Sequence, residues 1–248
     1  MFDLPPTLQV ADRKIEESHE RGYVTYSVAD ILKYSSNVGA VTIGLKLGSK
    51  DFDHWIHAFG FGAPTGVDFP GEEQGIVIPL HDYSGSTMGN LPIGQGLSVT
   101  PMQIATAYAA IANGGILRRP TLISSIGGQS AEEDTDPHRV ISARVAAQLR
   151  RMLEGVLEPG GTASAVSVPG YVLAGKTGTA QKVENGTYSD TKYVASFVGF
   201  APAQDPRLLV AVIVDEPQGE NYYGGSVAAP AFGKIAAFAL PYLGVPAE

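Results

Sequence analysis

One stretch of this chain, a predicted β-hairpin, constrains the fold more than any other. The apolar runs 171–173 and 193–200 flank a polar segment that contains Asn185-Gly186. Asn-Gly is the favoured pair for a two-residue hairpin turn, and apolar runs on both sides of it predict two antiparallel strands. The first strand carries Lys176 between small and hydroxyl residues, which is an unusual composition for a strand that only packs against a core.

The residues around Lys176 indicate a ligand rather than a core contact. Thr177 and Thr179 offer hydroxyls, Lys176 offers a positive charge, and Gly178 lacks a side chain, so that a ligand backbone can approach the strand closely. This combination suits an extended substrate that carries a carboxylate and lies along a sheet edge. The competing interpretation is a surface hairpin with a solvated lysine, so the pattern needs support from elsewhere in the chain.

Composition excludes several classes of function. The 248 residues, 44% hydrophobic and 17% charged, are enough for a globular domain with a large core. A net charge of −8 argues against non-specific binding to nucleic acid or to an anionic membrane. No apolar run reaches the roughly 20 residues of a spanning helix. The absence of cysteine excludes disulfides and a thiol nucleophile, and it fits a location outside the cytoplasm.

Helix starts are the clearest local signals. Thr100 followed by proline and then by Gln103 is a capping box with proline at the first helical position. Ser27 and Ser142 resemble further N-caps, and Ser49 is expected to cap a helix that ends at Gly60. The predicted helices begin at these residues and at Val38, whereas residues 1–26 are expected to be loop with short extended pieces.

The remaining elements are predicted from apolar runs. Residues 60–99 are rich in glycine, proline and aspartate and predict a long functional loop. Residues 208–214 are apolar on both faces, so we expect helices on both sides of that strand. The other expectations are a strand at 121–126, a solvated acidic loop at 130–138, a loop at 222–226 and a helix at 227–240.

The order of these elements predicts an α+β fold in one domain. Residues 1–160 are expected to be mainly helical, and residues 161–248 to form a small antiparallel sheet with a C-terminal helix. In this arrangement a helical subdomain packs beside a small antiparallel sheet that helices flank.

A second motif, Ser35-Ser36-Asn37, lies between two predicted helices. Serine and asparagine are ordinary caps at such a junction. However, a Ser-x-Asn element followed later by Lys-Thr-Gly is a signature of penicillin-recognising serine enzymes. The motifs that carry the match occur in the expected order at residues 34–39, 93–96, 100–103, 175–180 and 222–225. The chain therefore resembles the transpeptidase domain of class B penicillin-binding proteins.

The resemblance implies a β-lactamase-like transpeptidase fold, no cofactor, and roles for individual residues in cross-linking D-Ala-D-Ala stem peptides. Ser35 would belong to a proton relay, and Asn37 would hydrogen-bond the substrate amide. Lys176 would supply positive potential. Thr177 and Thr179 would bind the terminal carboxylate, the Thr179 N–H would serve the oxyanion hole, and the acyl group would lie against Gly178.

The nucleophile motif of the family, Ser-x-x-Lys at a helix start, does not precede Ser35. The only Ser-x-x-Lys is Ser189 to Lys192, in the hairpin connection, and we do not expect it to act as a nucleophile. The sequence is therefore identified as an N-terminally truncated member that lacks the first strands and the nucleophile helix. We expect no native acyl transfer, and a soluble chain without signal or anchor from a family that is extracytoplasmic and membrane-anchored.

Two other functions stay open. One is a non-catalytic module that binds peptidoglycan or β-lactams, and the other is an esterase-like hydrolase that uses Ser35 and Lys176. The expected partners are a stem peptide or a β-lactam, with no nucleic acid. We also expect a homo-oligomer, through the exposed edge of strand 208–214 or exchange of elements. No metal site is expected, because His54 and His57 flank Trp55 on a helix and are best explained as surface residues.

Overall fold

The three-stranded sheet predicted from the sequence organises the structure. The structure is a computed structural model that describes residues 1–130, 137–184 and 186–247. Its sheet has the order β11-β12-β13, with β11 at Ala174–Glu184, β12 at Thr187–Ala201 and β13 at Leu208–Asp215. Both pairings are antiparallel, as expected, and Lys176 lies opposite Val198 in the register. The α+β class is confirmed.

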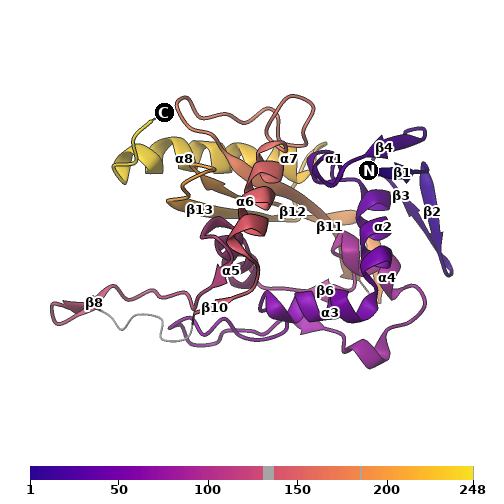
Figure 1. The fold of residues 1–248 in the computed structure, drawn as a ribbon, viewed down its shortest axis with the longest axis horizontal. Coiled ribbons are helices and arrows are strands. Elements are labelled where there is room, and N and C mark those ends of the chain that lie inside the picture. Colours follow the sequence, from indigo (N-terminus) through magenta and orange to yellow (C-terminus); the bar gives the residue numbers. More distant parts are fainter. Residues whose placement is uncertain (131–136, 185, 248) are drawn as a thin grey trace.

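Helices cover both faces of this sheet (Figure 1). On one face α8 (Ala229–Tyr242) packs Phe232 against Phe197, with ring centroids 4.8 Å apart. On the other face α5 (Pro101–Ala112) and α6 (Ala143–Glu154) pack against Phe200 and Leu209. The prediction that helices flank strand 208–214 on both sides is therefore confirmed. Phe197 and Phe232 in the core on one face, and Phe200 in the core on the other, are fully buried.

The N-terminal segment differs from the sequence expectation. Residues 1–26 were expected to be loop with short extended pieces, and they form four short strands that are paired. Leu4, Val10 and Ile15 from these strands pack into one core with Ile31 and Val38 of the next helices. Runs this short give little periodicity, so tertiary packing decided their structure. The strands are β1 (Phe2–Leu4), paired with β4 (Val24–Tyr26), and β2 (Thr7–Val10), paired with β3 (Arg13–Glu16).

Most predicted helix starts are correct. The capping box at Thr100 and Gln103 is present, and Ser27 and Ser142 accept hydrogen bonds from the first turns of their helices. Ser49 is a correction: Gly48 occupies the cap position and Ser49 is the first helical residue. The helices before the central loop are α1 (Val28–Tyr34), α2 (Asn37–Leu47) and α3 (Ser49–Ala58).

Residues 60–99 hold more structure than the predicted loop. They contain β5 (Ile76–Val77), paired with β6 (Leu97–Ser98), and α4 (Thr87–Asn90) between two single 3₁₀ turns, η1 (Leu80–Asp82) and η2 (Leu91–Ile93). Buried Gln103 holds this segment through side-chain N–H bonds to the carbonyls of Ala63 and Gln74, at 2.8 and 2.9 Å. The ordering of the segment therefore depends on α5.

Two further expectations need correction. The predicted strand at 121–126 is reduced to β8 (Ser125–Ile126), paired with β9 (Gln129–Ser130), since this hairpin projects from the body without a sheet to join (Figure 1). The predicted helix at 227–240 starts later, at Ala229, and the preceding loop contains the single turn α7 (Gly224–Val227). Most of the predicted acidic loop, residues 131–136, lies outside the described residues. Its end forms β10 (His138–Arg139), which pairs with β7 (Ile116–Leu117).

Candidate active site

Ser35 occupies a sharp turn between α1 and α2. Its backbone is left-handed, with φ 54° and ψ 45°, a conformation that residues other than glycine adopt at a cost of about 1 kcal/mol. The next residue, Ser36, has an extended backbone and caps α2 by accepting a 3.0 Å hydrogen bond from the Gly39 N–H. The turn therefore separates the two helices and leaves the Ser35 side chain outside both of them.

A buried carboxylate holds this turn. Glu17 accepts hydrogen bonds from the Ser36 hydroxyl at 2.6 Å and from the Asn37 N–H at 2.7 Å. Arg21 forms an ion pair with Glu17 at 2.5 Å, and the side chains of Arg21 and Glu17 are only 16% and 9% exposed. Sequence reasoning missed both residues, because nothing local relates them to a turn some 20 positions away.

Lys176 approaches the same turn from β11. Its Nζ donates hydrogen bonds to the Ser35 Oγ at 2.8 Å and to the Thr177 carbonyl at 3.0 Å. Burial lowers the pKa of Lys176 to about 8, because desolvation penalises the ammonium. In the part of the chain that the structure describes, no carboxylate forms an ion pair with Lys176. The group can therefore exchange its proton at near-neutral pH.

The two threonines after Lys176 have different surroundings. The Thr177 Oγ1 lies 2.8 Å from the Thr162 Oγ1 and 3.4 Å from the Lys176 Nζ. Thr179 is exposed, and its hydroxyl accepts a 3.0 Å hydrogen bond from the N–H of Gly224 at the start of α7. Both hydroxyls thus lie on the strand beside Lys176, and each is oriented by a partner outside β11.

Gly178 also lies close to the neighbouring strand. The sequence suggested that its missing side chain makes room for the ligand. In the structure, a Cβ at Gly178 would lie 2.4 Å from the Ser196 Oγ of the neighbouring strand, and a Cβ at Gly224 would lie 2.2 Å from the Ser196 carbonyl oxygen. These glycines therefore permit the close approach of β11, β12 and α7.

Asn37 is the first residue of α2, and its side chain is fixed by β3. Its Nδ2 donates a 2.8 Å hydrogen bond to the carbonyl of Glu16. The structure thus brings Ser35 and Lys176 into direct contact, whereas the described contacts of the Asn37 side chain are with Glu16.

Aromatic rings stack beside the hairpin. Tyr193 of β12 stacks on Tyr222 with a centroid distance of 4.0 Å, and Tyr222 stacks on Tyr223 at 4.6 Å. His19, from the loop after β3, lies 5.7 Å from the Tyr223 ring. The sequence shows only the pair 222–223, so the continuous stack arises from the tertiary structure.

The other Ser-x-x-Lys pair has no activated geometry. The Ser189 hydroxyl accepts from the backbone N–H groups of Thr191 and Lys192, and the Lys192 Nζ forms an ion pair with Glu184 at 2.5 Å. The lysine is therefore directed to a carboxylate rather than to Ser189.

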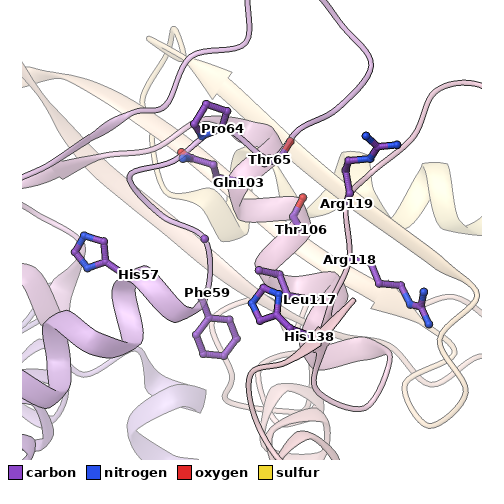
Figure 2. A pocket seen from close by; sticks show the side chains of 11 residues that line it. His57, Phe59, Pro64, Thr65, Gln103, Thr106, Leu117, Arg118, Arg119 and His138 are labelled. Atoms are coloured by element: carbon purple, nitrogen blue, oxygen red, sulfur yellow. The ribbon is translucent and has the colours of Figure 1, made fainter. Parts of the chain in front are cut away.

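A cavity of about 410 Å³ lies apart from these residues. Figure 2 shows it between the end of α3, the face of α5 with Gln103 and Thr106, and the β7–β10 pair, while Arg118 and Arg119 point away from His57. Among the described residues no group of three His, Asp or Glu side chains could hold a metal ion. Within the same residues, no helix is both long and apolar enough to cross a membrane.

The model of one protein family, the penicillin binding protein transpeptidase domain, matches residues 3–237 of this chain. The chain belongs to this family. PbpB of Mycobacterium tuberculosis is 36% identical over 259 residues, which cover 99% of this chain and 38% of that protein. The stage V sporulation protein D of Bacillus subtilis is 40% identical over 230 residues, covering 90% of this chain and 35% of the relative.

Solved structures agree with this assignment. The apo form of penicillin binding protein 3 from M. tuberculosis has a TM-score of 0.91 and 36% identity, and the match covers 100% of this chain and 58% of that one. The same protein complexed with ampicillin gives a TM-score of 0.90 and 34% identity, over 100% of this chain and 57% of that one. The transpeptidase domain described here thus spans about two fifths of the length of the curated relatives.

Proposed function

We propose that the transpeptidase domain binds the D-alanyl-D-alanine end of a peptidoglycan stem peptide, or a β-lactam, in the space beside Ser35, Lys176 and Thr179. The observation that carries the proposal is the 2.8 Å contact between the Lys176 Nζ and the Ser35 Oγ. It joins the two motifs across the helical part and the sheet. A protonated lysine and two oriented threonine hydroxyls are suited to a terminal carboxylate.

We propose a role for each of the residues that the two motifs contribute. Lys176 supplies positive charge, and the hydroxyls of Thr177 and Thr179 bind the carboxylate. Ser35 accepts from Lys176, so its own hydroxyl proton remains available for a relay toward the leaving amine. Asn37 contacts the substrate amide. The acyl group lies against Gly178, and the neighbouring Thr179 N–H acts as an oxyanion donor.

The whole family protein would cross-link stem peptides outside the cytoplasm, where its substrate lies. This chain has no Ser-x-x-Lys before Ser35. We therefore propose recognition of the ligand without native acyl transfer by these residues alone, which makes binding rather than turnover the relevant measurement.

Calorimetry with a pentapeptide ending in D-Ala-D-Ala tests the recognition step. We expect binding to the parent chain, clearly weaker binding to Lys176→Met, and unchanged binding to Lys192→Met, a control on the same hairpin. The proposal would be wrong if the Lys176→Met and Lys192→Met variants bound the pentapeptide with equal affinity.

One observation favours a second candidate, an esterase-like hydrolase. Ser35 and Lys176 themselves form a serine–lysine pair, and the lowered pKa of Lys176 would let it accept the hydroxyl proton. Turnover of a p-nitrophenyl ester that is lost in Ser35→Ala and retained in Ser189→Ala would support this activity. Turnover that survives in Ser35→Ala would exclude it.

We also propose self-association through β13. Among the described residues β13 pairs only with β12, and an unpaired apolar strand edge is a site for pairing with another chain. Light scattering at micromolar concentration should find a dimer or a larger species, and a monomer would contradict the proposal.

A further inference from the structure

Thr162 joins the two halves of the site described above. It lies in the loop between α6 and β11, and its N–H donates a 3.3 Å hydrogen bond to the carbonyl of Lys33 in α1, two residues before Ser35. Its hydroxyl lies 2.8 Å from the hydroxyl of Thr177 in β11. A single residue therefore contacts the helix that ends at Ser35 and the strand that carries Lys176.

The backbone of Thr162 is firmly held. The next residue, Ala163, is 1% exposed and donates a 2.9 Å hydrogen bond to the carbonyl of Val156. On the other side, a Cβ at Gly225 of α7 would lie 2.0 Å from the Thr162 carbonyl oxygen. The loop is thus packed between α6, α1 and α7, while Thr162 itself is exposed.

The hydroxyl of Thr162 is the outer end of a row of polar groups. From Thr162 the row passes to the Thr177 Oγ1 at 2.8 Å, then to the Lys176 Nζ at 3.4 Å, and then to the Ser35 Oγ at 2.8 Å. Lysine can only donate, and a threonine hydroxyl carries one hydrogen. The direction in which the Thr177 hydrogen points therefore depends on whether Thr162 donates to it or accepts from it.

We propose that Thr162 is a positioning residue that orients the Thr177 hydroxyl toward the carboxylate of the bound ligand. When Thr162 donates to Thr177, the Thr177 hydrogen is free to point at an anion beside Lys176. Hydrogen bonds arranged head to tail polarise one another, so the bond to the carboxylate is strengthened. This inference rests on the proposed function, because it assumes a carboxylate ligand at Thr177.

Two variants separate the hydroxyl from the packing of Thr162. Thr162→Val keeps the shape and removes the hydrogen bond, whereas Thr162→Ser keeps the hydroxyl. Ser164→Ala, an exposed position on the same loop, is the matched control. Each variant is titrated by calorimetry with the D-Ala-D-Ala pentapeptide and with the same peptide as its C-terminal amide, which lacks the carboxylate.

We expect Thr162→Val to weaken binding of the carboxylate peptide roughly three- to tenfold, the usual effect of one hydrogen bond, and to leave binding of the amide unchanged. Thr162→Ser and Ser164→Ala should match the parent with both peptides. Unchanged binding of both peptides by Thr162→Val, or an equal loss for both, would overturn the proposal, since an equal loss indicates a structural effect only.

A second readout is independent of the ligand. The ¹³Cε shift of Lys176, followed by NMR as pH is raised, reports its titration in the unliganded chain. Removing the polar row should shift this titration in Thr162→Val and not in Thr162→Ser. The two claims can fail separately. The proposed function fails if the parent chain binds the carboxylate peptide no better than the amide. The role of Thr162 fails if Lys176 titrates identically in the parent chain and in Thr162→Val.

Discussion

The ammonium of Lys176 donates a 2.8 Å hydrogen bond to the hydroxyl of Ser35, although the two residues lie 141 positions apart in the sequence. The contact joins a strand of the sheet to the turn between two helices. Lys176 is desolvated there, which lowers its pKa to about 8. The charge of its ammonium therefore changes as the pH passes through 8.

Binding of a carboxylate ligand should depend on this charge. Below pH 8 Lys176 is mostly protonated and attracts the anion, and above pH 8 the charge is lost. We expect the affinity for a D-Ala-D-Ala peptide to fall as pH rises from 7 to 9.5, measured by calorimetry. The Lys176→Met variant should bind weakly with no such pH dependence. An affinity that stays constant across this range in the parent chain would contradict the assigned role.

Stability should change with pH in the opposite direction. The folded-state pKa of Lys176 is lowered from the ordinary value of 10.5 to about 8, so the unfolded chain binds more protons between these two values. The free energy of unfolding contributed by this group therefore rises as pH increases from 8 to 10.5. The difference in thermal midpoint between the parent chain and Lys176→Met is the measurement. A difference that does not change in this direction would show that Lys176 is solvated in the folded state.

Removal of the Glu17 carboxylate should destabilise the turn at Ser35. Glu17→Ala leaves Arg21 without its partner and removes two hydrogen bonds to residues 36 and 37, so we expect a loss of about 3 kcal/mol in denaturant unfolding. Glu20→Ala, an exposed position in the same loop, is the control and should have little effect. Similar unfolding midpoints for the two variants would mean that Glu17 does not hold the turn.

The glycines at positions 178 and 224 should respond differently to alanine. At Gly224 the new Cβ would meet the backbone oxygens of Ser196 and Gly178, at 2.2 and 2.4 Å, and backbone cannot move aside cheaply. At Gly178 it would meet the Ser196 hydroxyl, which can rotate. We expect Gly224→Ala to cost about 2–3 kcal/mol and Gly178→Ala clearly less, by denaturant unfolding. A Ser196→Ala background should reduce the loss of stability caused by Gly178→Ala and leave that caused by Gly224→Ala unchanged. A larger loss of stability for Gly178→Ala than for Gly224→Ala would contradict the prediction.

No covalent penicillin adduct is expected on this chain. Ser189 is not activated by Lys192, which pairs with Glu184. Intact-mass spectrometry after incubation with a β-lactam should therefore find the unmodified mass. An added mass equal to the β-lactam would contradict this expectation, and Ser35→Ala would then test whether Ser35 is the serine that carries it.

Local signals accounted for much of the fold. The Thr100–Gln103 capping box, the Ser142 cap and the antiparallel pair β11–β12 are predicted by residues close together in the chain, and the structure has these elements. Asn185 of the predicted turn lies outside the described residues. The paired N-terminal strands were missed, because strands of three or four residues are specified by the core that they cover.

The sequence by itself determined the family, through motifs that keep their order, and it determined the strand that presents Lys176. Only the tertiary structure decided that Lys176 contacts Ser35, that Glu17 holds the turn and that Thr162 bridges α1 and β11. The physical reason is the separation along the sequence of the residues that interact. A cap or a turn is specified by neighbours a few residues away, whereas hydrogen bonds between distant segments form only where packing of the core places their atoms within about 3 Å.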